Sequence, residues 1–191
     1  MTENELVRAA RSGDQSAFEA LVKANQAMAY QLAYRMTGNP EDAADLTQEA
    51  FLSAWRSLAS FQGQSAFSTW LYRLTSNACI DFLRREKRRG ALSLTAEDEE
   101  EERQLEVPDE RFSPERELEK KEAQRTVREG LLSLSPEHRE VLVLRELEGL
   151  SYEEIAQTLG LEEGTVKSRL ARARIALKDF LQKSGNFFEP L

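Results

Sequence analysis

Residues 151–181 read SYEEIAQTLGLEEGTVKSRLARARIALKDFL, and this stretch decides the fold of the C-terminal part of the chain. Ile155 and Leu159 predict a short helix that ends at Gly160, and a second helix begins a few residues later. Two helices joined by a tight turn with glycine at the corner are typical of a helix-turn-helix. At 100° per residue the second helix has one narrow apolar stripe, which we expect to be buried. The stripe consists of Val166, Leu170, Ala173 and Leu177.

Polar side chains gather off this stripe, in the first turns of the second helix. They are Thr165, Lys167, Ser168, Arg169 and Arg172. In a helix-turn-helix this part of the helix enters the DNA major groove, where Arg and Lys donate to guanine edges and to phosphates. Two alternatives stay open at this point: a surface helix with solvated charges, or a domain that contacts only protein.

Helix signals continue through most of the chain. Asn39-Pro40, Ser113-Pro114 and Ser135-Pro136 each offer an N-cap followed by proline at the first helical position, and Ser151 with Glu154 fits a capping box. No alternating strand pattern competes. We predict an all-α fold of two small helical domains, the second with four helices. The predicted helices span 3–11, 15–36, 40–58, 66–87, 115–133, 137–148, 152–159 and 163–182.

The charge of the chain is uneven. The net charge is −8, but residues 91–122 carry 13 acidic and 5 basic residues, so they account for all of the excess. Residues 91–114, which include the run Glu97–Glu102, hold too few bulky apolar side chains to offset the entropy of ordering. We predict a first domain over 1–90, an acidic linker over 91–114, a second domain over 115–184 and a tail over 185–191. The whole-chain charge therefore does not exclude DNA binding.

Several function classes find no support in the sequence. No apolar run approaches the length of a membrane span, and no signal peptide is visible at the N-terminus. The single cysteine, Cys79, cannot form an internal disulfide, and His138 has no second ligand nearby for a metal. Phosphate-binding loops and nucleophile motifs are missing too. We expect a cytoplasmic protein that is no enzyme and needs no cofactor, metal or small-molecule substrate.

The N-terminal part carries two further patterns. On a helical wheel of residues 42–58, an acidic and polar face is formed by Asp45, Gln48, Glu49 and Leu52. Such a face suits docking on a partner helix, although most such faces are only solvated. Residues 60–90 then combine an uncharged loop of aromatic and small polar residues with a helix that ends in five basic residues. Stacking rings beside cations suit single-stranded DNA, and the alternative is that the aromatic rings belong to the core.

These stretches resemble a known family. The sequences DLTQEAFLSAW (45–55) and SFQGQSAFSTWLYRLTSNACIDFLRR (60–85) are similar to the second conserved region of extracytoplasmic-function sigma factors. The sequence LSPEHREVLVLRELEGLSYEEIAQTLGLEEGTVKSRLARARIAL (134–177) is similar to their fourth region. The resemblance covers nearly the whole chain except the linker. Response regulators share the helix-turn-helix but would need an α/β receiver domain.

The resemblance implies partners and residue roles. The face with Asp45, Gln48, Glu49 and Leu52 would bind the clamp helices of the largest subunit of RNA polymerase. Single-stranded −10 promoter DNA, with one base flipped out, would be bound by Phe61, Gln62, Ser65, Phe67, Arg73, Asn77 and Arg84. The helix-turn-helix would read the −35 element through Thr165, Lys167, Ser168, Arg169 and Arg172, while its domain packs on the polymerase flap.

Two further expectations come with the family. Such factors are commonly held by an anti-sigma protein, often one anchored at the membrane. For the linker, two interpretations stay open: the run Glu97–Glu102 mimics nucleic acid in a basic channel of the polymerase, or it is a solvated spacer. A stand-alone regulator that binds duplex DNA without polymerase is the rival to the sigma-factor interpretation.

Overall fold

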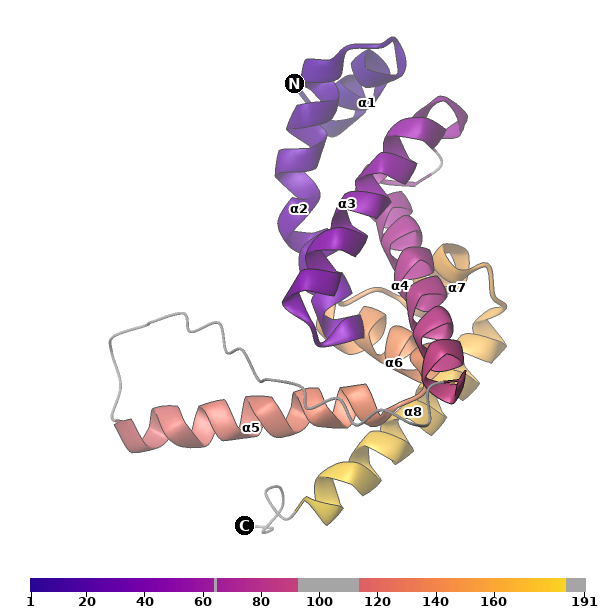
Figure 1. The fold of residues 1–191 in the computed structure, drawn as a ribbon. Helices are drawn as coiled ribbons and strands as arrows, with labels where there is room; N and C mark the ends of the chain where they lie inside the picture. Colours follow the sequence, from indigo (N-terminus) through magenta and orange to yellow (C-terminus); the bar gives the residue numbers. More distant parts are fainter. Residues whose placement is uncertain (64, 93–113, 185–191) are drawn as a thin grey trace.

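The computed structural model describes residues 1–63, 65–92 and 114–184, which are helical almost throughout (Figure 1). No strand occurs in these ranges, so the predicted all-α class is confirmed. The linker falls almost wholly outside the described residues, as does the tail from 185 to 191. The elements are α1 (Glu3–Arg11), α2 (Gln15–Thr37), α3 (Pro40–Ser57), the 3-10 turn η1 (Leu58–Ser60), α4 (Phe67–Leu92), α5 (Pro114–Ser133), α6 (Pro136–Leu142), the π-helical turn η2 (Val143–Leu147), α7 (Tyr152–Leu159) and α8 (Glu163–Lys183).

Local side-chain caps set where the helices begin. The Asn39 side chain accepts hydrogen bonds from the amides of Glu41 (2.8 Å) and Asp42 (3.2 Å) at the start of α3. At α7 the predicted capping box is confirmed. The Ser151 hydroxyl accepts from the Glu154 amide (3.1 Å), and the Glu154 carboxylate accepts from the Ser151 amide (2.7 Å). These bonds satisfy amides that have no partner within the first turn of a helix.

The segment predicted as one helix over 137–148 is α6 followed by η2. Residues 141–144 are all buried, and four consecutive helical residues point in four directions about 100° apart. The segment is therefore enclosed on every side. At its end the Glu148 amide donates to the Val143 carbonyl five residues back (3.1 Å), and the Glu148 side chain contacts α2 and α4.

Two apolar clusters form the core. The first lies among the N-terminal helices and includes Val7, Leu21, Phe51, Phe67 and Leu71. The second combines residues of α2, α3 and α4 with residues of the C-terminal half, and it includes Leu32, Met36, Leu46, Cys79, Val141, Leu144, Ile155 and Leu170. The two helical parts of the chain therefore pack on a shared core, with α6 and α7 against α4 (Figure 1). The boundaries 1–90 and 115–184 stay predictions.

A buried arginine ties α6 to the ends of two other helices. Arg139 is 6% exposed and donates only to backbone carbonyls. Its Nε donates to Leu131 (2.8 Å) and its Nη2 to Leu132 (2.6 Å) and Leu134 (3.1 Å), at the C-terminus of α5. Its Nη1 donates to the carbonyl of Met36, near the end of α2. Carbonyls at helix C-termini lack partners within the helix and carry partial negative charge, so one cation stabilises both ends.

Two buried carboxyl groups complete the contact between the N-terminal half (α1 to α4) and the C-terminal half (α5 to α8). The Ser76 hydroxyl of α4 donates to Glu140 Oε1 of α6 at 2.7 Å. The Tyr72 hydroxyl, also of α4, donates to Glu148 Oε2 at 2.8 Å, and Arg35 of α2 pairs with the other oxygen of Glu148. Burial raises the pKa of Tyr72, and the adjacent Glu148 carboxylate raises it further. Each of these two carboxyl groups, Glu140 and Glu148, is thus bonded to donors from the N-terminal half.

The Glu140 carboxyl is the buried group that should respond to pH. Burial raises its pKa to about 7, although the Ser76 hydroxyl and the nearby Arg169 and Arg84 act to lower it, and Glu137 acts to raise it. In the unfolded chain the same carboxyl ionises near pH 4.5. Between pH 4.5 and about 7 the folded chain binds more protons than the unfolded chain. The contribution of Glu140 to stability therefore falls as pH rises.

We expect Glu140→Gln to remove this pH dependence. The amide keeps an oxygen that can accept from Ser76 but cannot ionise. The wild type should lose up to about 1.4 kcal/mol of unfolding free energy per pH unit relative to the variant as pH rises from about 4.5 to 7. Urea unfolding of both proteins across this window measures the difference, which should level off above pH 7. A difference that does not change with pH would contradict a buried, protonated carboxyl.

A glycine pair tests the packing of α2 against α5. Gly38 and Gly160 both end a helix in the left-handed region, with φ of 75° and 65°, where a side chain costs about 1 kcal/mol or more. A Cβ on Gly38 would lie 2.6 Å from Leu132 Cδ1, whereas one on Gly160 meets nothing within 4 Å. Gly38→Ala should therefore lower the free energy of unfolding more than Gly160→Ala in urea titrations. Equal losses would argue against the contact with Leu132.

Candidate functional site

The polar face predicted on α3 is a groove in the structure. The groove is open, has a volume of about 480 Å³ and runs along α3 alone. It is lined by the predicted residues Asp45, Gln48, Glu49 and Leu52 together with Ser53, Arg56 and Ser57. Leu52 is 49% exposed and lies in the same groove as the carboxylates of Asp45 and Glu49. The opposite side of α3 is in the core through Leu46, Ala50 and Ala54. The predicted residues are therefore brought together on one accessible surface.

The loop before α4 divides into buried rings and exposed polar residues. Phe61 and Phe67 are 7% and 1% exposed, and Phe61 stacks on Trp70 with ring centroids 4.8 Å apart. These two rings pack in the core in this conformation, whereas Gln62 is exposed and Ser65 is partly exposed. The role of this loop in binding a flipped base stays a prediction.

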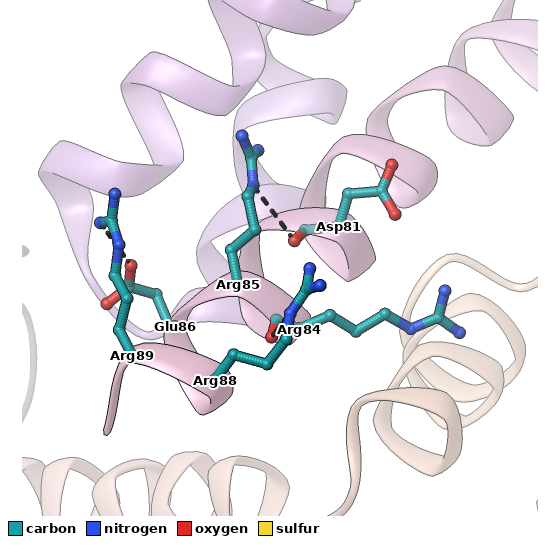
Figure 2. Close-up of polar contacts among 6 residues, drawn as sticks. All are labelled: Asp81, Arg84, Arg85, Glu86, Arg88 and Arg89. Carbon is teal, nitrogen blue, oxygen red and sulfur yellow. Dashed lines mark hydrogen bonds and ion pairs between the residues drawn. The ribbon is translucent and has the colours of Figure 1, made fainter. Parts of the chain in front are cut away.

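The exposed side of α4 carries the predicted basic face. Arg73, Asn77 and Arg84 are all exposed on this helix. Toward its C-terminus the arginines diverge, and Figure 2 shows Arg84 extending toward the C-terminal helices while Arg85 turns back along α4. Neighbouring carboxylates pair with part of this charge: Arg89 with Glu86 at 3.0 Å, and Arg84 with Glu137 of α6 at 3.4 Å. Exposed pairs of this kind contribute little to stability.

Helices α7 and α8 form the predicted helix-turn-helix. Gly160 adopts φ 65° at the turn, and the apolar stripe on α8 is buried at Val166, Leu170 and Ala173 and half-buried at Leu177. Three of the predicted contact residues, Lys167, Ser168 and Arg172, are exposed, and two, Thr165 and Arg169, are partly buried. Lys167 also pairs with Glu163 at 3.1 Å and lies 5.6 Å from the centre of the Tyr152 ring.

One flank of α8 is already bonded to the rest of its domain. Arg174 donates to Glu146 Oε1 from Nε (3.1 Å) and from Nη2 (2.5 Å), and the hydrogen bond to Glu146 raises its pKa. Arg172 lies on the other flank and is exposed. The two arginines, which are only two residues apart, therefore have different surroundings.

The predicted DNA-contacting faces of the two halves meet in one cleft of about 330 Å³. Asn77 and Arg84 line it from α4, and Arg169 lines it from α8. Between them lie Glu137 and Glu140 of α6. The pKa of Glu137 is lowered by a backbone hydrogen bond and by Arg84 and Arg169. Residues predicted to bind two different DNA elements are thus side by side in this structure.

Sequence reasoning missed the residues that hold this arrangement, namely Arg139, Glu140 and Glu148 with their partners. Ser76 and Glu140 are 64 positions apart, and Tyr72 and Glu148 are 76 apart. Such pairs leave no local pattern. The one available signal was that Arg139 and Glu140 interrupt an apolar helix at positions that face inward.

The remaining candidate residues form neither a reactive site nor a metal site within the part of the chain that the structure describes. Cys79 is buried, and burial raises the pKa of its thiol to about 12, which disfavours the reactive thiolate. Within residues 1–63, 65–92 and 114–184, no three His, Cys, Asp or Glu residues are grouped so that they could hold a metal ion. No helix in these ranges is both long enough and apolar enough to span a membrane.

Comparison with known proteins places the chain in a family. Residues 21–89 match the family Sigma-70 region 2, and residues 124–177 match Sigma-70, region 4. The ECF RNA polymerase sigma factor SigE of Mycolicibacterium smegmatis is 42% identical over 92% of this chain and 66% of its own length. The RNA polymerase sigma-H factor of Pseudomonas aeruginosa is 40% identical over 94% of both chains. The ECF RNA polymerase sigma factor SigW of Bacillus subtilis is 36% identical over 92% of this chain and 95% of its own length.

Two solved structures have a fold similar to that of this chain. CnrH, in complex with the cytosolic domain of CnrY, is similar with a TM-score of 0.66 and 28% identity over 95% of this chain and 97% of that one. The sigma factor RpoE of Bartonella quintana, in complex with the anti-sigma factor NepR, has a TM-score of 0.67 and 25% identity over 86% and 96%. From the two family matches, the relatives and the shared fold, we conclude that the chain belongs to the extracytoplasmic-function (ECF) RNA polymerase sigma factors, which direct the polymerase to promoters.

Proposed function

We propose that this ECF sigma factor docks on the clamp helices of the largest polymerase subunit through the α3 groove. The observation that carries this proposal is that Asp45, Gln48, Glu49 and Leu52 line one open groove. A partner with basic side chains around an apolar contact would cover Leu52 and pair with both carboxylates. Burying the apolar side chain adds affinity, and the charges add orientation and speed of association.

The basic face of α4 and the loop before it would bind the −10 element as single-stranded DNA. Arg73, Asn77 and Arg84 are exposed in a row along the helix and can track the phosphate backbone. Gln62 and Ser65, on the accessible part of the loop, would contact a base that has left the stack. The buried Phe61 and Phe67 would support that part of the loop from below.

The helix-turn-helix would read the −35 element as duplex, with its domain on the polymerase flap. Arg172, Lys167 and Ser168 are exposed on the N-terminal half of α8, the part of such a helix that enters the major groove. Arg169 and Thr165, which are partly buried in this structure, would complete the contact.

Regulation follows from the same relatives. Two similar structures are complexes, one of CnrH with the cytosolic domain of CnrY and one of RpoE with the anti-sigma factor NepR. We infer that this chain also has an anti-sigma partner, that it works in the cytoplasm on a stress or envelope regulon, and that it has no catalytic site of its own.

Charge reversal in the α3 groove should abolish polymerase binding. In Asp45→Arg/Glu49→Arg, two cations replace the carboxylates opposite a basic partner surface. The variant should remain folded, since both side chains are exposed, yet fail to retain core polymerase in a pull-down. Glu19→Arg/Glu41→Arg makes the same charge change on exposed positions of α2 and α3 outside the groove and should bind normally. Undiminished binding by the first variant would refute the proposed docking groove.

Arg172 and Arg174 should differ in their effect on promoter recognition. Arg172→Ala should remove a base or phosphate contact worth about 1–3 kcal/mol if it is bidentate to a guanine. Arg174→Ala should cost much less DNA affinity, because Arg174 is already bonded to Glu146 on the other flank. Abortive transcription with promoters varied at each −35 position separates the two. Equal losses with unchanged base preference would mean that α8 presents a different flank to DNA.

A further inference from the structure

We propose that helix α1 is a brace that fixes the loop between η1 and α4 in the shape that binds the unstacked −10 base, with Glu3 and Arg11 as its positioning residues. The inference rests on the role proposed above for Gln62 and Ser65, and it extends that role to residues that would not themselves contact DNA. Helix α1 precedes residues 21–89, the segment that matches Sigma-70 region 2.

Both ends of the loop are bonded to α1. At one end, Glu3 Oε1 accepts from the amide of Phe67 at 2.9 Å, where α4 begins. At the other end, Arg11 Nη2 donates to the carbonyl of Ala59 in η1 at 3.3 Å. Glu3 and Arg11 are the first and last residues of α1, so they lie about 12 Å apart along the helix axis. The helix therefore spans the loop and holds the chain where the loop begins and where it ends.

The start of α4 depends on this contact. Helices α1, α2, α3, α6 and α7 each begin with a local N-cap side chain that accepts from amides of the first turn. At α4 the amide of the first residue, Phe67, donates to Glu3, which is 64 positions away. Unpaired amides give a helix N-terminus partial positive charge, which a carboxylate stabilises. Because Glu3 also lies in the first turn of α1, one carboxylate serves two helix N-termini and fixes them relative to each other.

Apolar packing supports the brace from below. Val7 and Ala10 of α1 are 6% and 3% exposed and belong to the same cluster as Phe61 and Phe67 of the loop. This burial supplies most of the stability of the contact, whereas two hydrogen bonds at exposed side chains contribute less. The hydrogen bonds are directional, so they set where α1 lies along the loop. Their removal should change the shape of the loop without unfolding the domain.

The residues proposed to contact the base lie between the two fixed ends. Gln62 is exposed and Ser65 is partly exposed. A loop that is already held in its binding shape loses less conformational freedom when a base enters. It also discriminates better, because polar groups held in place match one base edge and stay unpaired with another. Glu3 and Arg11 would therefore influence base selection through the position of this loop.

The test compares two double variants of α1 in the full-length chain. Glu3→Ala/Arg11→Ala removes both contacts to the loop. Glu5→Ala/Arg8→Ala is the matched control, since it removes one acid and one base from the same helix. Glu5 accepts from the Thr2 amide at 2.8 Å, and Arg8 donates to a carbonyl of the preceding turn at 3.4 Å. The control therefore weakens α1 itself but leaves its contacts to the loop.

The first measurement is the hydrogen exchange of the Phe67 amide, followed by NMR in the free chain. This amide should exchange about fivefold faster in Glu3→Ala/Arg11→Ala, because its acceptor is lost. In the control the change should stay below about twofold. Circular dichroism and retention of core polymerase in a pull-down show that each variant keeps its fold.

The second measurement is abortive transcription by reconstituted holoenzyme on promoters varied at each −10 position. The ratio of rates between the preferred base and the other bases should fall about fivefold at the position that the loop reads, with unchanged preference in the −35 element. A purely structural role would lower the rates on all promoters alike. Gln62→Ala alters the loop directly and should lower the ratio at the same position.

The outcomes separate the brace from the function of the loop. Unchanged exchange of the Phe67 amide would overturn the brace, whatever happens in transcription. Faster exchange with unchanged base ratios would overturn its role in base selection, and equal effects of the two α1 variants would overturn the specific roles of Glu3 and Arg11. If Gln62→Ala leaves every −10 ratio unchanged, the proposed function of the loop itself fails. Faster exchange and a lower ratio in Glu3→Ala/Arg11→Ala alone support the proposal.

Discussion

The guanidinium of Arg139 is the interaction on which the arrangement of this molecule depends. It lies where the C-termini of α5 and α2 meet, and it donates to carbonyls of both. Without it, carbonyls of two helices would face each other in a space with little water, each carrying partial negative charge. Because Arg139 is part of α6, satisfying both ends also fixes that helix between the halves. The neighbouring Glu140 and the following Glu148 are then aimed at α4 and α2.

Local charge, rather than net charge, separates the surfaces of the N-terminal half. The α3 groove presents Asp45 and Glu49, while the adjacent α4 presents Arg73 and Arg84. A partner protein with basic side chains and a DNA strand are therefore attracted to different faces of the same small bundle. With the roles proposed above, a polymerase and a promoter would occupy different surfaces of the chain.

The sequence was a good guide to everything that local patterns determine. Helix boundaries followed from caps such as Asn39 and Ser151, and the buried stripe of α8 followed from a spacing of three and four residues. The four residues of the α3 face were predicted to lie together, and in the structure they line one groove. The packing of the halves could not be predicted in this way, because it rests on pairs such as Ser76 with Glu140 that only the folded chain brings together. The aromatic loop shows a second limit, since ring composition alone did not distinguish a stacking surface from the core position that Phe67 occupies.

The distance between α2 and α8 during transcription initiation tests most directly how the two halves of the chain bind a promoter. Fluorescent labels on cysteines introduced at the exposed positions Glu19 and Asp179 would report it, while the buried Cys79 stays unlabelled. We predict one distance in the free chain and a longer one when core polymerase and a promoter are added, because the −10 and −35 elements lie roughly 25 base pairs, or about 85 Å, apart along the duplex. An unchanged distance in a complex that synthesises RNA would contradict the binding of the two promoter elements by separate halves of the chain.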